Sequence, residues 1–333
     1  MKRGDSGLSL VVAVDKPRGM SSHDVVNRVR RIFGERRVGH TGTLDPLATG
    51  VLPICIGPAA KLDRFMTAHD KRYRVTISFG FETDTDDSEG EPTEYGIVSE
   101  DLYDSEFARA TIEAMIGEHD QVPPAYSAIK VDGKRAYLLA RSGKAQELEP
   151  RRIEVYDALL VSVEEGPDEV GVFWTIDFSV SKGTYIRALA RDLGRSLGCP
   201  AHVSALQRIQ AGNVKLDDCV SLETLETLGL DAAIDPVAIV GLRFAFADDY
   251  ERLVENGSTL PNTLNPLYEA PYSAAEDKYC ACTGSLVVSN EEPHDGELVC
   301  MVVGNRLKAI YMYSSDRGLY KPECVFSVGV IRG

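Results

Sequence analysis

Hydrophobic and polar positions along the chain recur at two spacings, one typical of strands and one typical of helices. Residues 8–14 form an apolar run, which predicts a buried strand. Residues 73–79 alternate between apolar and polar side chains, so we expect a strand with one buried face. The longer segments 153–163 and 170–180 have the same character, and we expect these two strands to pair with each other.

Helical spacing begins after a serine that can cap a helix. Ser21 and Asp24 match a capping box, and the apolar residues that follow recur every three or four positions as far as Phe33. Gly34 stands where such a helix ends. Three further helices are predicted over residues 105–116, 135–142 and 184–197.

Three short segments carry local signals. Residues 52–56 resemble a strand, but Pro53 lacks a backbone N–H and therefore predicts an edge strand or a strand start. Residues 82–91 are acidic, and Glu89 stands where a calcium loop needs glycine, so we interpret the segment as a solvated loop. The pair Asp132-Gly133 predicts a tight turn.

The composition changes after about residue 212. Residues 213–245 have the character of a linker with one or two helical turns, and residues 246–333 are acidic and strand-rich. Within the latter, residues 298–303 and 307–313 should pair through a turn at Gly304-Asn305. Together these patterns predict an α+β protein, in which a mixed, mainly antiparallel sheet domain is followed by a small β domain.

The cysteines and the hydropathy of the chain indicate the cellular compartment in which we expect the protein. The seven cysteines have no regular spacing, which favours a reducing cytoplasm over a disulfide framework. No apolar run reaches the roughly 18 residues that a membrane span needs, and residues 1–5 lack the apolar core of a signal peptide. We therefore expect a cytoplasmic protein without a membrane segment.

The net charge of −15 is unevenly distributed. Residues 1–80 hold 14 Lys and Arg against 7 Asp and Glu, whereas residues 81–120 hold 1 against 14. A polyanion responds to the local field, because salt screens charges beyond about 8–10 Å. The basic N-terminal block therefore admits a nucleic-acid partner, although a basic block can equally be a solvated helix face.

The segment 39–50 contains the strongest candidate for chemistry. Gly42 and the other two glycines of this segment permit backbone angles that other residues avoid, and Pro46 restricts the residue before it to extended angles. Asp45 is therefore held in one place. Two interpretations remain open: Asp45 caps a short helix that begins at Pro46, or it presents a carboxylate to a ligand.

Six separated blocks, in this order, resemble the TruB-type pseudouridine synthases, which isomerise the T-loop uridine of transfer RNA. They span roughly residues 9–212. Six blocks in register make coincidence unlikely, since a single short motif has a high false-positive rate. The blocks are residues 15–22, 39–46, 71–74, 121–128, 181–187 and 201–206.

The resemblance implies a domain organisation and a set of partners. Residues 1–212 would form the pseudouridine synthase catalytic domain, 213–245 a linker, and 246–333 a small PUA-like β domain with an insertion near 261–297. The substrate would be the T arm of tRNA, with no protein partner required and a monomeric protein. Uracil leaves the ribose at N1 and returns through C5 without a redox change, so no cofactor or metal is needed.

The same resemblance assigns roles to individual residues. Asp45 would be the catalytic nucleophile, because a temporary covalent bond divides a difficult step into easier ones. Attack on the ribose C1′, attack on the uracil C6 and removal of a sugar proton remain open. Arg187 would pair with this carboxylate and keep it ionised; otherwise it is an exposed helix charge.

The remaining residues would bind the RNA. Tyr73 would stack on the flipped base, or else is a core aromatic of its strand. Tyr185 would line the pocket, and Leu206 would lie beneath the base. His40 would lie near the flipped nucleotide and assist its entry, although a lone histidine is more often structural.

Supporting and backbone-binding residues complete the candidate site. Lys16 and Pro17 match a motif that supports the active-site loop. The candidate contacts to RNA phosphates are Arg28, Arg30, Arg31, Arg36 and Arg37. Four C-terminal cysteines raise the question of zinc, but their C-x-C spacing fits no standard finger, and no metal site is expected.

Two other functions compete with an RNA isomerase. A catalytically silent RNA-binding or RNA-folding protein on the same fold is the main alternative, but it does not require Asp45, Tyr73, Tyr185 and Arg187 together. A subunit of a guide-RNA-directed modification complex shares the catalytic motif, yet residues 121–137 have a bacterial character. The pattern therefore favours the isomerase.

Overall fold

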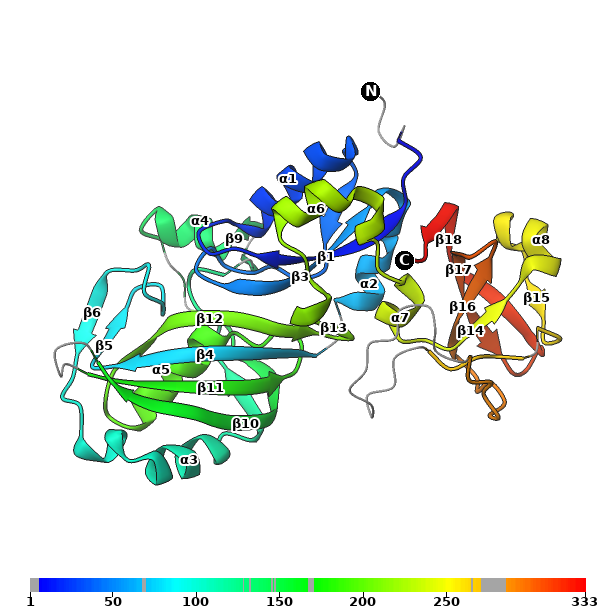
Figure 1. Cartoon of the computed structure of the whole chain (residues 1–333). Helices are drawn as coiled ribbons and strands as arrows, with labels where there is room; N and C mark the ends of the chain where they lie inside the picture. Colours follow the sequence, from blue (N-terminus) through cyan, green and yellow to red (C-terminus); the bar gives the residue numbers. More distant parts are fainter. Residues whose placement is uncertain are drawn as a thin grey trace. The chain divides into compact units, whose positions relative to one another are not determined.

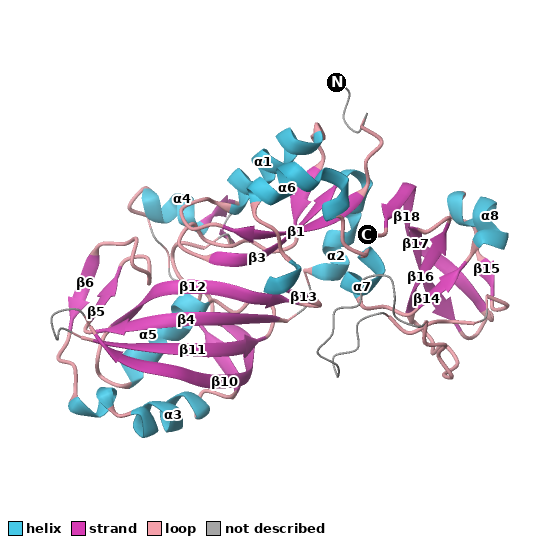
Figure 2. Cartoon of the chain, in the orientation of Figure 1, coloured by secondary structure: helices cyan, strands magenta, loops and turns pink. Residues whose placement is uncertain are grey.

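The computed structural model describes residues 6–67, 70–127, 129–131, 133–144, 146, 148–166, 171–264, 266–270 and 286–333. The chain divides into two compact units, which we describe separately (Figure 1). The first unit comprises residues 1–45, 50–68 and 211–333, and the second comprises residues 46–49 and 69–210. Both contain helices and strands, as the α+β prediction requires (Figure 2).

The N-terminal strands of the first unit form an antiparallel ladder. β1 (Leu10–Lys16) pairs with β3 (Thr49–Ile56), and β2 (Val38–His40) also pairs with β3. Residues 10–14 are buried throughout, so the predicted buried strand is confirmed. The strand predicted over 52–56 is also confirmed, and it begins three residues earlier.

The edge position predicted from Pro53 is wrong, because β3 has β1 on one side and β2 on the other. The Pro53 carbonyl accepts a 3.2 Å hydrogen bond from the Thr41 N–H, just beyond the last residue of β2. In a strand, the N–H and C=O of one residue point to the same side. The missing N–H of proline therefore falls where the short β2 ladder has already ended.

The first helix has the ends that the sequence predicts. α1 (Ser22–Phe33) begins with the complete capping box of Ser21 and Asp24, and Gly34 ends it with a left-handed φ of 61°. The helix α6 (Leu222–Leu228) lies beside α1, and Arg28 of α1 forms an ion pair with Glu226 of α6. Both helices are visible side by side in Figure 1.

The segment predicted as a linker contains more structure than one or two helical turns. It includes β13 (Val214–Lys215), α6, and α7 (Pro236–Val240), which Asp235 caps through the Val237 N–H at 2.9 Å. Every residue of α7 is buried. The predicted boundaries at 212 and 245 remain predictions.

A five-stranded sheet forms the C-terminal part of the first unit. Its strand order is β14 (Phe244–Phe246), β16 (Leu298–Val303), β17 (Arg306–Ser314), β18 (Leu319–Ile331) and β15 (Leu260–Pro261). The predicted hairpin is confirmed: β16 and β17 pair antiparallel, and Gly304 and Asn305 both have a φ of 55°. Positive φ at both central residues is the requirement of a type I′ turn. The short helix α8 (Glu251–Glu255) packs on β17 and β18.

Both faces of this sheet are buried, which explains why β16 is apolar throughout. One face contributes Cys300 and Val302 to a cluster that also contains Val11 of β1 and Val237 of α7. The other face contributes Met301 to a separate cluster beneath α8 and β15. The short helices η1 (Gly57–Leu62) and α2 (Asp63–Met66) contact the same sheet. The Lys61 ammonium of η1 donates to the Val325 carbonyl at 2.8 Å, and the Arg64 guanidinium of α2 donates to the Glu323 carbonyl at 2.7 Å. The first unit therefore has continuous packing from β1 to β18.

The second unit is built on one sheet in the order β12, β4, β11, β10, β7. Its strands are β4 (Lys71–Phe79), β7 (Gly117–Gln121), β10 (Arg151–Glu165), β11 (Val172–Val180) and β12 (Ala201–Ala211). The predicted strand at 73–79 and the antiparallel pairing of the two long strands are confirmed. Trp174 of β11 is fully buried and packs at a tilt against Phe79, with 4.7 Å between ring centroids and an interplanar angle of 59°. Its indole N–H donates to the Leu102 carbonyl at 2.8 Å.

Helices and two small hairpins complete the second unit. α5 (Ile186–Ser196) covers one face of the sheet (Figure 2). The helix predicted over 105–116 is shorter than expected: α3 (Ser105–Glu113) has Ala114 as its C-cap, because Gly117 already begins β7. The helix α4 (Ala136–Arg141) confirms the prediction at 135–142. The hairpins are β5 (Phe81–Thr83) with β6 (Pro92–Tyr95), and β8 (Lys130–Val131) with β9 (Lys134–Arg135). Asp132 of the predicted tight turn lies outside the described residues.

Candidate active site

The loop that carries Asp45 is fixed from inside the first unit. Leu44 is only 4% exposed, and the Ser22 hydroxyl bonds to both of its backbone groups. The Leu44 N–H donates to the Ser22 Oγ at 2.8 Å, and that hydroxyl donates to the Leu44 carbonyl at 3.0 Å. Asp45 follows directly and is half-buried. The carboxylate is therefore attached to a backbone segment with a defined position.

The helix-cap interpretation of Asp45 is wrong. Residues 46–48 form a bend without helical structure, and β3 begins at Thr49. Three residues between Asp45 and a strand are too few for a turn of α-helix, which needs 3.6 residues. The ligand-facing interpretation stays a prediction.

The supporting residues of this loop are internal. Lys16 is fully buried, and its ammonium donates to the carbonyls of Pro17 at 3.0 Å and Met20 at 2.6 Å. It thereby ties the end of β1 to the turn before α1. The His40 Nδ1 accepts a 3.3 Å bond from the Gly42 N–H, so a neutral His40 carries its proton on Nε2.

Two predicted base-contacting residues lie on neighbouring strands of the second unit. Tyr73 on β4 is 9% exposed and pairs in register with Phe178 of β11. Leu206 on β12 is buried to a similar degree. Both side chains therefore belong largely to the interior of the unit.

Tyr185 stands at the start of α5 and is held by a side-chain amide. Its N–H donates to the Gln121 Oε1 at 2.9 Å, and the Gln121 Nε2 donates to its carbonyl at 3.1 Å. Gln121 is the last residue of β7 and is almost completely buried. The Tyr185 side chain does not cap the N-terminus of α5, and Gln121 restrains the backbone at this helix end.

Three arginines on one face of α5 reach the acidic segment that follows β4. They are four residues apart and therefore share a helix face. The ion pairs are Arg187–Asp87 at 3.6 Å, Arg191–Asp86 at 3.1 Å and Arg195–Glu82 at 2.8 Å. The prediction that residues 82–91 form a solvated loop holds only in part: these three carboxylates are buried, whereas Asp84, Glu89 and Glu91 are exposed.

Arg187 is also anchored by backbone carbonyls. Its guanidinium donates to the Thr85 carbonyl at 2.7 Å and to the Tyr126 carbonyl at 2.9 Å. Its exposed fraction is 4%, so the alternative of an exposed helix charge is excluded. Planar guanidinium groups with several fixed partners lose little freedom when they bind a carboxylate.

Asp86 has an unusual environment. Burial raises its pKa from 3.8 to about 6, although the charges of Arg191 and Arg187 act in the opposite direction. Its φ of 60° is left-handed, which is uncommon for a residue other than glycine. The turn at Asp86 is therefore held by its surroundings and not by local preference.

The arginines predicted to contact RNA phosphates differ in their availability. Arg28 is paired with Glu226, Arg30 donates to the Val38 carbonyl at 3.3 Å, and Arg37 donates to the Gly57 carbonyl at 2.8 Å. Arg31 and Arg36 are exposed. Three members of the set thus contribute to the fold of the first unit.

Two residues with evident roles in these arrangements were not singled out by the sequence. Ser22 and Gln121 each bond to both backbone groups of a residue beside or within the predicted site. Both lie within the blocks that carry the family resemblance, at the end of 15–22 and the start of 121–128. Their position in those blocks was the signal available.

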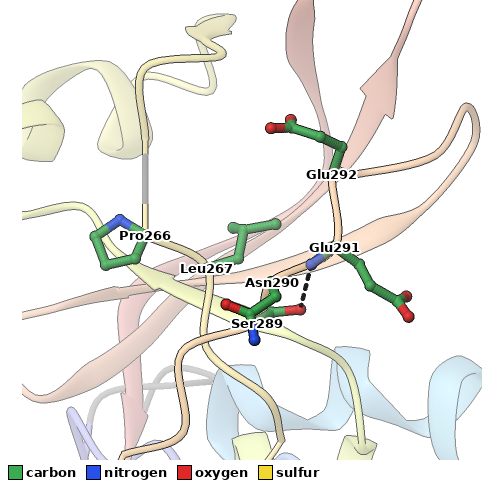
Figure 3. Close-up of a pocket in the computed structure, with 6 residues that line it drawn as sticks. All are labelled: Pro266, Leu267, Ser289, Asn290, Glu291 and Glu292. Carbon is green, nitrogen blue, oxygen red and sulfur yellow. Dashed lines mark hydrogen bonds between the residues drawn. The ribbon is translucent and has the colours of Figure 1, made fainter.

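A separate pocket lies in the C-terminal part of the first unit (Figure 3). It is lined by Pro266, Leu267, Ser289, Asn290, Glu291 and Glu292. None of the predicted site residues lines it. Within it, the Glu291 N–H donates to the Ser289 Oγ at 3.5 Å.

The described residues contain no group of His, Cys, Asp or Glu that could hold a metal ion. Cys300 and Cys324 are buried free thiols, and burial raises the pKa of both. Cys280 and Cys282 lie outside the described residues. Among the helices that the structure describes, none has the length and apolar character of a membrane span.

Comparison with known proteins gives consistent matches along the chain. Residues 30–186 match the TruB family pseudouridylate synthase N-terminal domain, and residues 187–238 match the tRNA pseudouridylate synthase B C-terminal domain. The chain is 44% identical to tRNA pseudouridine synthase B of Solibacter usitatus over 289 residues, covering 84% of this chain and 94% of that protein. It is 37% identical to tRNA pseudouridine synthase B of Bacillus velezensis over 326 residues, covering 95% and 96%.

Solved structures share the fold at lower identity. A structure of an H/ACA RNP bound to a substrate RNA containing 2′-deoxyuridine has a TM-score of 0.64 and 22% identity, covering 96% of this chain and 85% of that chain. The archaeal box H/ACA sRNP Nop10-Cbf5 complex gives a TM-score of 0.63 and 23% identity, covering 95% and 86%. These likenesses concern the fold alone.

Proposed function

The chain belongs to the TruB family of pseudouridylate synthases and is a tRNA pseudouridine synthase, an isomerase; we propose that Asp45 is its nucleophile and that the T-loop uridine is its target. The single observation that carries the proposal for Asp45 is its position next to Leu44, which is buried and whose N–H and C=O both form hydrogen bonds with the Ser22 hydroxyl. A nucleophile gains most when the backbone that carries it is fixed before the substrate arrives. A surface aspartate on a mobile loop lacks this property.

The isomerisation detaches uracil from the ribose at N1 and reattaches it through C5. Asp45 forms the temporary covalent bond that divides this exchange into two steps, and regeneration of the free carboxylate completes the turnover. Attack at C1′ and attack at C6 are two versions of this covalent role, and removal of a sugar proton is a third, non-covalent role that stays open.

The uridine must leave its stack before it can react. Flipping costs about a few kcal/mol, and stacking on an aromatic face returns about 1–3 kcal/mol per base. Tyr73 supplies this face in our proposal, with Tyr185 and Leu206 against the same base and His40 near its entry. The buried positions of Tyr73 and Leu206 support an apolar pocket that excludes water.

Arg187 completes the proposed chemistry by pairing with the Asp45 carboxylate. An arginine that is already held by the Thr85 and Tyr126 carbonyls does not have to be ordered when the substrate binds. Its charge keeps the carboxylate ionised as the base enters and water leaves. No cofactor takes part in the proposed reaction.

The proposed partner is the T arm of tRNA, bound by a monomeric protein in the cytoplasm. The basic character of residues 1–80 supports this proposal, and Arg31, Arg36 and Arg37 are the exposed members of the predicted contact set. The acidic residues elsewhere would confine the RNA to the basic region, because like charges repel the phosphates.

One experiment tests the function and the nucleophile together. The wild-type protein and Asp45→Asn are incubated with an unmodified T-arm stem-loop, and pseudouridine is measured. We expect conversion by the wild type, none by Asp45→Asn, and RNA affinities that agree within about threefold, because Asn preserves the shape of the side chain. Asp63→Asn, an exposed aspartate in the same unit, is the control and should retain activity.

Each alternative gives a different result. If neither protein converts the RNA but both bind it, the catalytically silent RNA-binding alternative is correct. If Asp45→Asn converts the RNA at the wild-type rate, another group is the nucleophile.

A further inference from the structure

Ser22 connects the start of α1 to the loop of Asp45. It is the first residue of the helix, and its side chain is turned inward, with an exposed fraction of 3%. Its neighbour Ser21 has a different task, because the Ser21 Oγ accepts from the Asp24 N–H and completes the capping box. The two serines therefore have different roles: Ser21 caps the helix, and Ser22 bonds to a backbone segment that is distant in the sequence.

The bonds from Ser22 satisfy groups that have no access to water. A hydroxyl is one donor and also an acceptor, and Ser22 uses both capacities on Leu44. Leu44 is buried, so its N–H and C=O would lack partners if the hydroxyl were removed. The backbone would then move until it found other partners, and Asp45 is the next residue along.

The frame behind Ser22 is rigid. Val25, Val26 and Val29 of α1 are completely or almost completely buried, and the helix has defined ends at both Ser21 and Gly34. The position of the Ser22 hydroxyl is thus set by the core of the first unit. The two hydrogen bonds from Ser22 therefore fix the Leu44 backbone relative to α1, and Asp45 is attached directly to Leu44.

We propose that Ser22 is a positioning residue for catalysis, which fixes the Asp45 carboxylate through its paired hydrogen bonds to the backbone of Leu44. The proposal rests on the proposed role of Asp45 as the nucleophile. It makes no claim that Ser22 contacts the RNA. Displacement of a reacting group by about 1 Å can cost about 100-fold in rate, so the effect belongs in the chemical step.

The test compares two neighbouring serines under single-turnover conditions with the T-arm stem-loop. Ser22→Ala removes both bonds to Leu44, whereas Ser21→Ala removes the helix cap and leaves those bonds in place. We expect Ser22→Ala to lower the rate constant by about tenfold or more. We expect the RNA Kd to stay within about threefold, since no RNA contact is removed. Ser21→Ala should lower the Tm but leave the rate constant within about twofold of the wild type, since a lost helix cap reduces stability only.

Two results would overturn the proposal. One is a Ser22→Ala protein that reacts within about twofold of the wild type, which would mean that Leu44 keeps its position without the hydroxyl. The other is an equal loss of rate in Ser21→Ala, which would assign the effect to the helix start. Ser22→Cys covers the case in which Ser22→Ala does not fold, because a thiol keeps the shape but is a weaker hydrogen-bonding group. In that case, a folded Ser22→Cys protein that reacts at the wild-type rate takes the place of the first result.

The outcome is separable from that of the proposed function. If the wild type produces no pseudouridine, the proposed function fails before Ser22 is considered. If the wild type is active and Asp45→Asn is equally active, the nucleophile is wrong. Only with an active wild type and an inactive Asp45→Asn does the rate of Ser22→Ala decide the positioning role.

Discussion

Replacing Arg191 with methionine isolates the electrostatic contribution of the contact between α5 and the acidic segment. Arg191→Met keeps much of the side-chain volume but removes the guanidinium that binds Asp86 at 3.1 Å and the Val122 carbonyl at 2.8 Å. The side chains of the pair are 10% and 11% exposed. Removing one partner of a buried pair costs about 3–5 kcal/mol, because the other charge stays buried and uncompensated. That is a large part of the roughly 5–15 kcal/mol that stabilises a typical domain.

The loss should depend on pH in a direction set by Asp86. Burial already raises its pKa to about 6, and the removal of Arg191 takes away a charge that lowers it. An acid with a higher pKa in the folded state binds its proton more tightly there. Stability is therefore lost as the pH rises from the unfolded pKa through the folded pKa. We expect the deficit of Arg191→Met to be smallest near about pH 4.5 and to grow above about pH 6 by at most about 1.4 kcal/mol per pH unit.

The assay uses the one tryptophan of the chain. Trp174 is fully buried in the second unit, so its fluorescence during urea denaturation reports the unfolding of that unit. Arg152→Met is the matched control: its pair with Glu118 is well exposed, and we expect a change below about 1 kcal/mol. The reasoning is refuted if Arg191→Met unfolds within about 1 kcal/mol of the wild type at neutral pH, or if its deficit does not vary with pH.

Three further predictions address the site and its surroundings. Gln121→Glu keeps the shape but, when ionised, loses the donor to the Tyr185 carbonyl, so single-turnover rates should fall by about tenfold with little change in RNA Kd; an unchanged rate would contradict this role. Burial, with the charges of nearby cations, lowers the pKa of Lys71 to about 8. A base with a lowered folded pKa regains stability as the pH rises from that value to its unfolded pKa. The wild type should therefore gain up to about 3 kcal/mol relative to Lys71→Met between about pH 8 and 10.5, measured by denaturation; a constant difference would refute it. Arg36→Ala should reduce the slope of log K against log salt by about 1, and Arg28→Ala by less, because Arg28 is already paired; equal slopes would place the RNA elsewhere.

Features that depend on neighbouring residues could be predicted from the sequence. The capping box at Ser21, the glycine stop at Gly34 and the turn at Gly304-Asn305 are local rules, and the structure confirms each. The alternation of β4 was equally informative, since one buried face imposes a period of two. The family resemblance supplied the function from separated blocks, which no single pattern could do.

Features that depend on distant partners could not be predicted. Residues 82–91 are strongly acidic, and charge alone predicts solvent exposure. The arginines that pair with the buried Asp87, Asp86 and Glu82 are 100 to 113 positions away. Pro53 depends on where β2 ends, which the sequence of β3 does not contain. For the candidate site, Asp45 could be identified from its block. The bonds of the Ser22 hydroxyl to Leu44 and of the Gln121 amide to Tyr185 depend on the folded chain and could not be predicted.

The buried cluster between β1 and the C-terminal sheet limits which C-terminal regions of relatives can replace that of this protein. Val11, Leu62 and Met66 share that cluster with Cys300, Leu307 and Phe326. A C-terminal region transplanted from a relative must therefore bring side chains of matching volume, because cores tolerate little mismatch. A truncated protein lacking these strands would present the same residues to water and aggregate. Recombination at residue 245 therefore has to conserve the side chains of this buried cluster, and not only those on the protein surface.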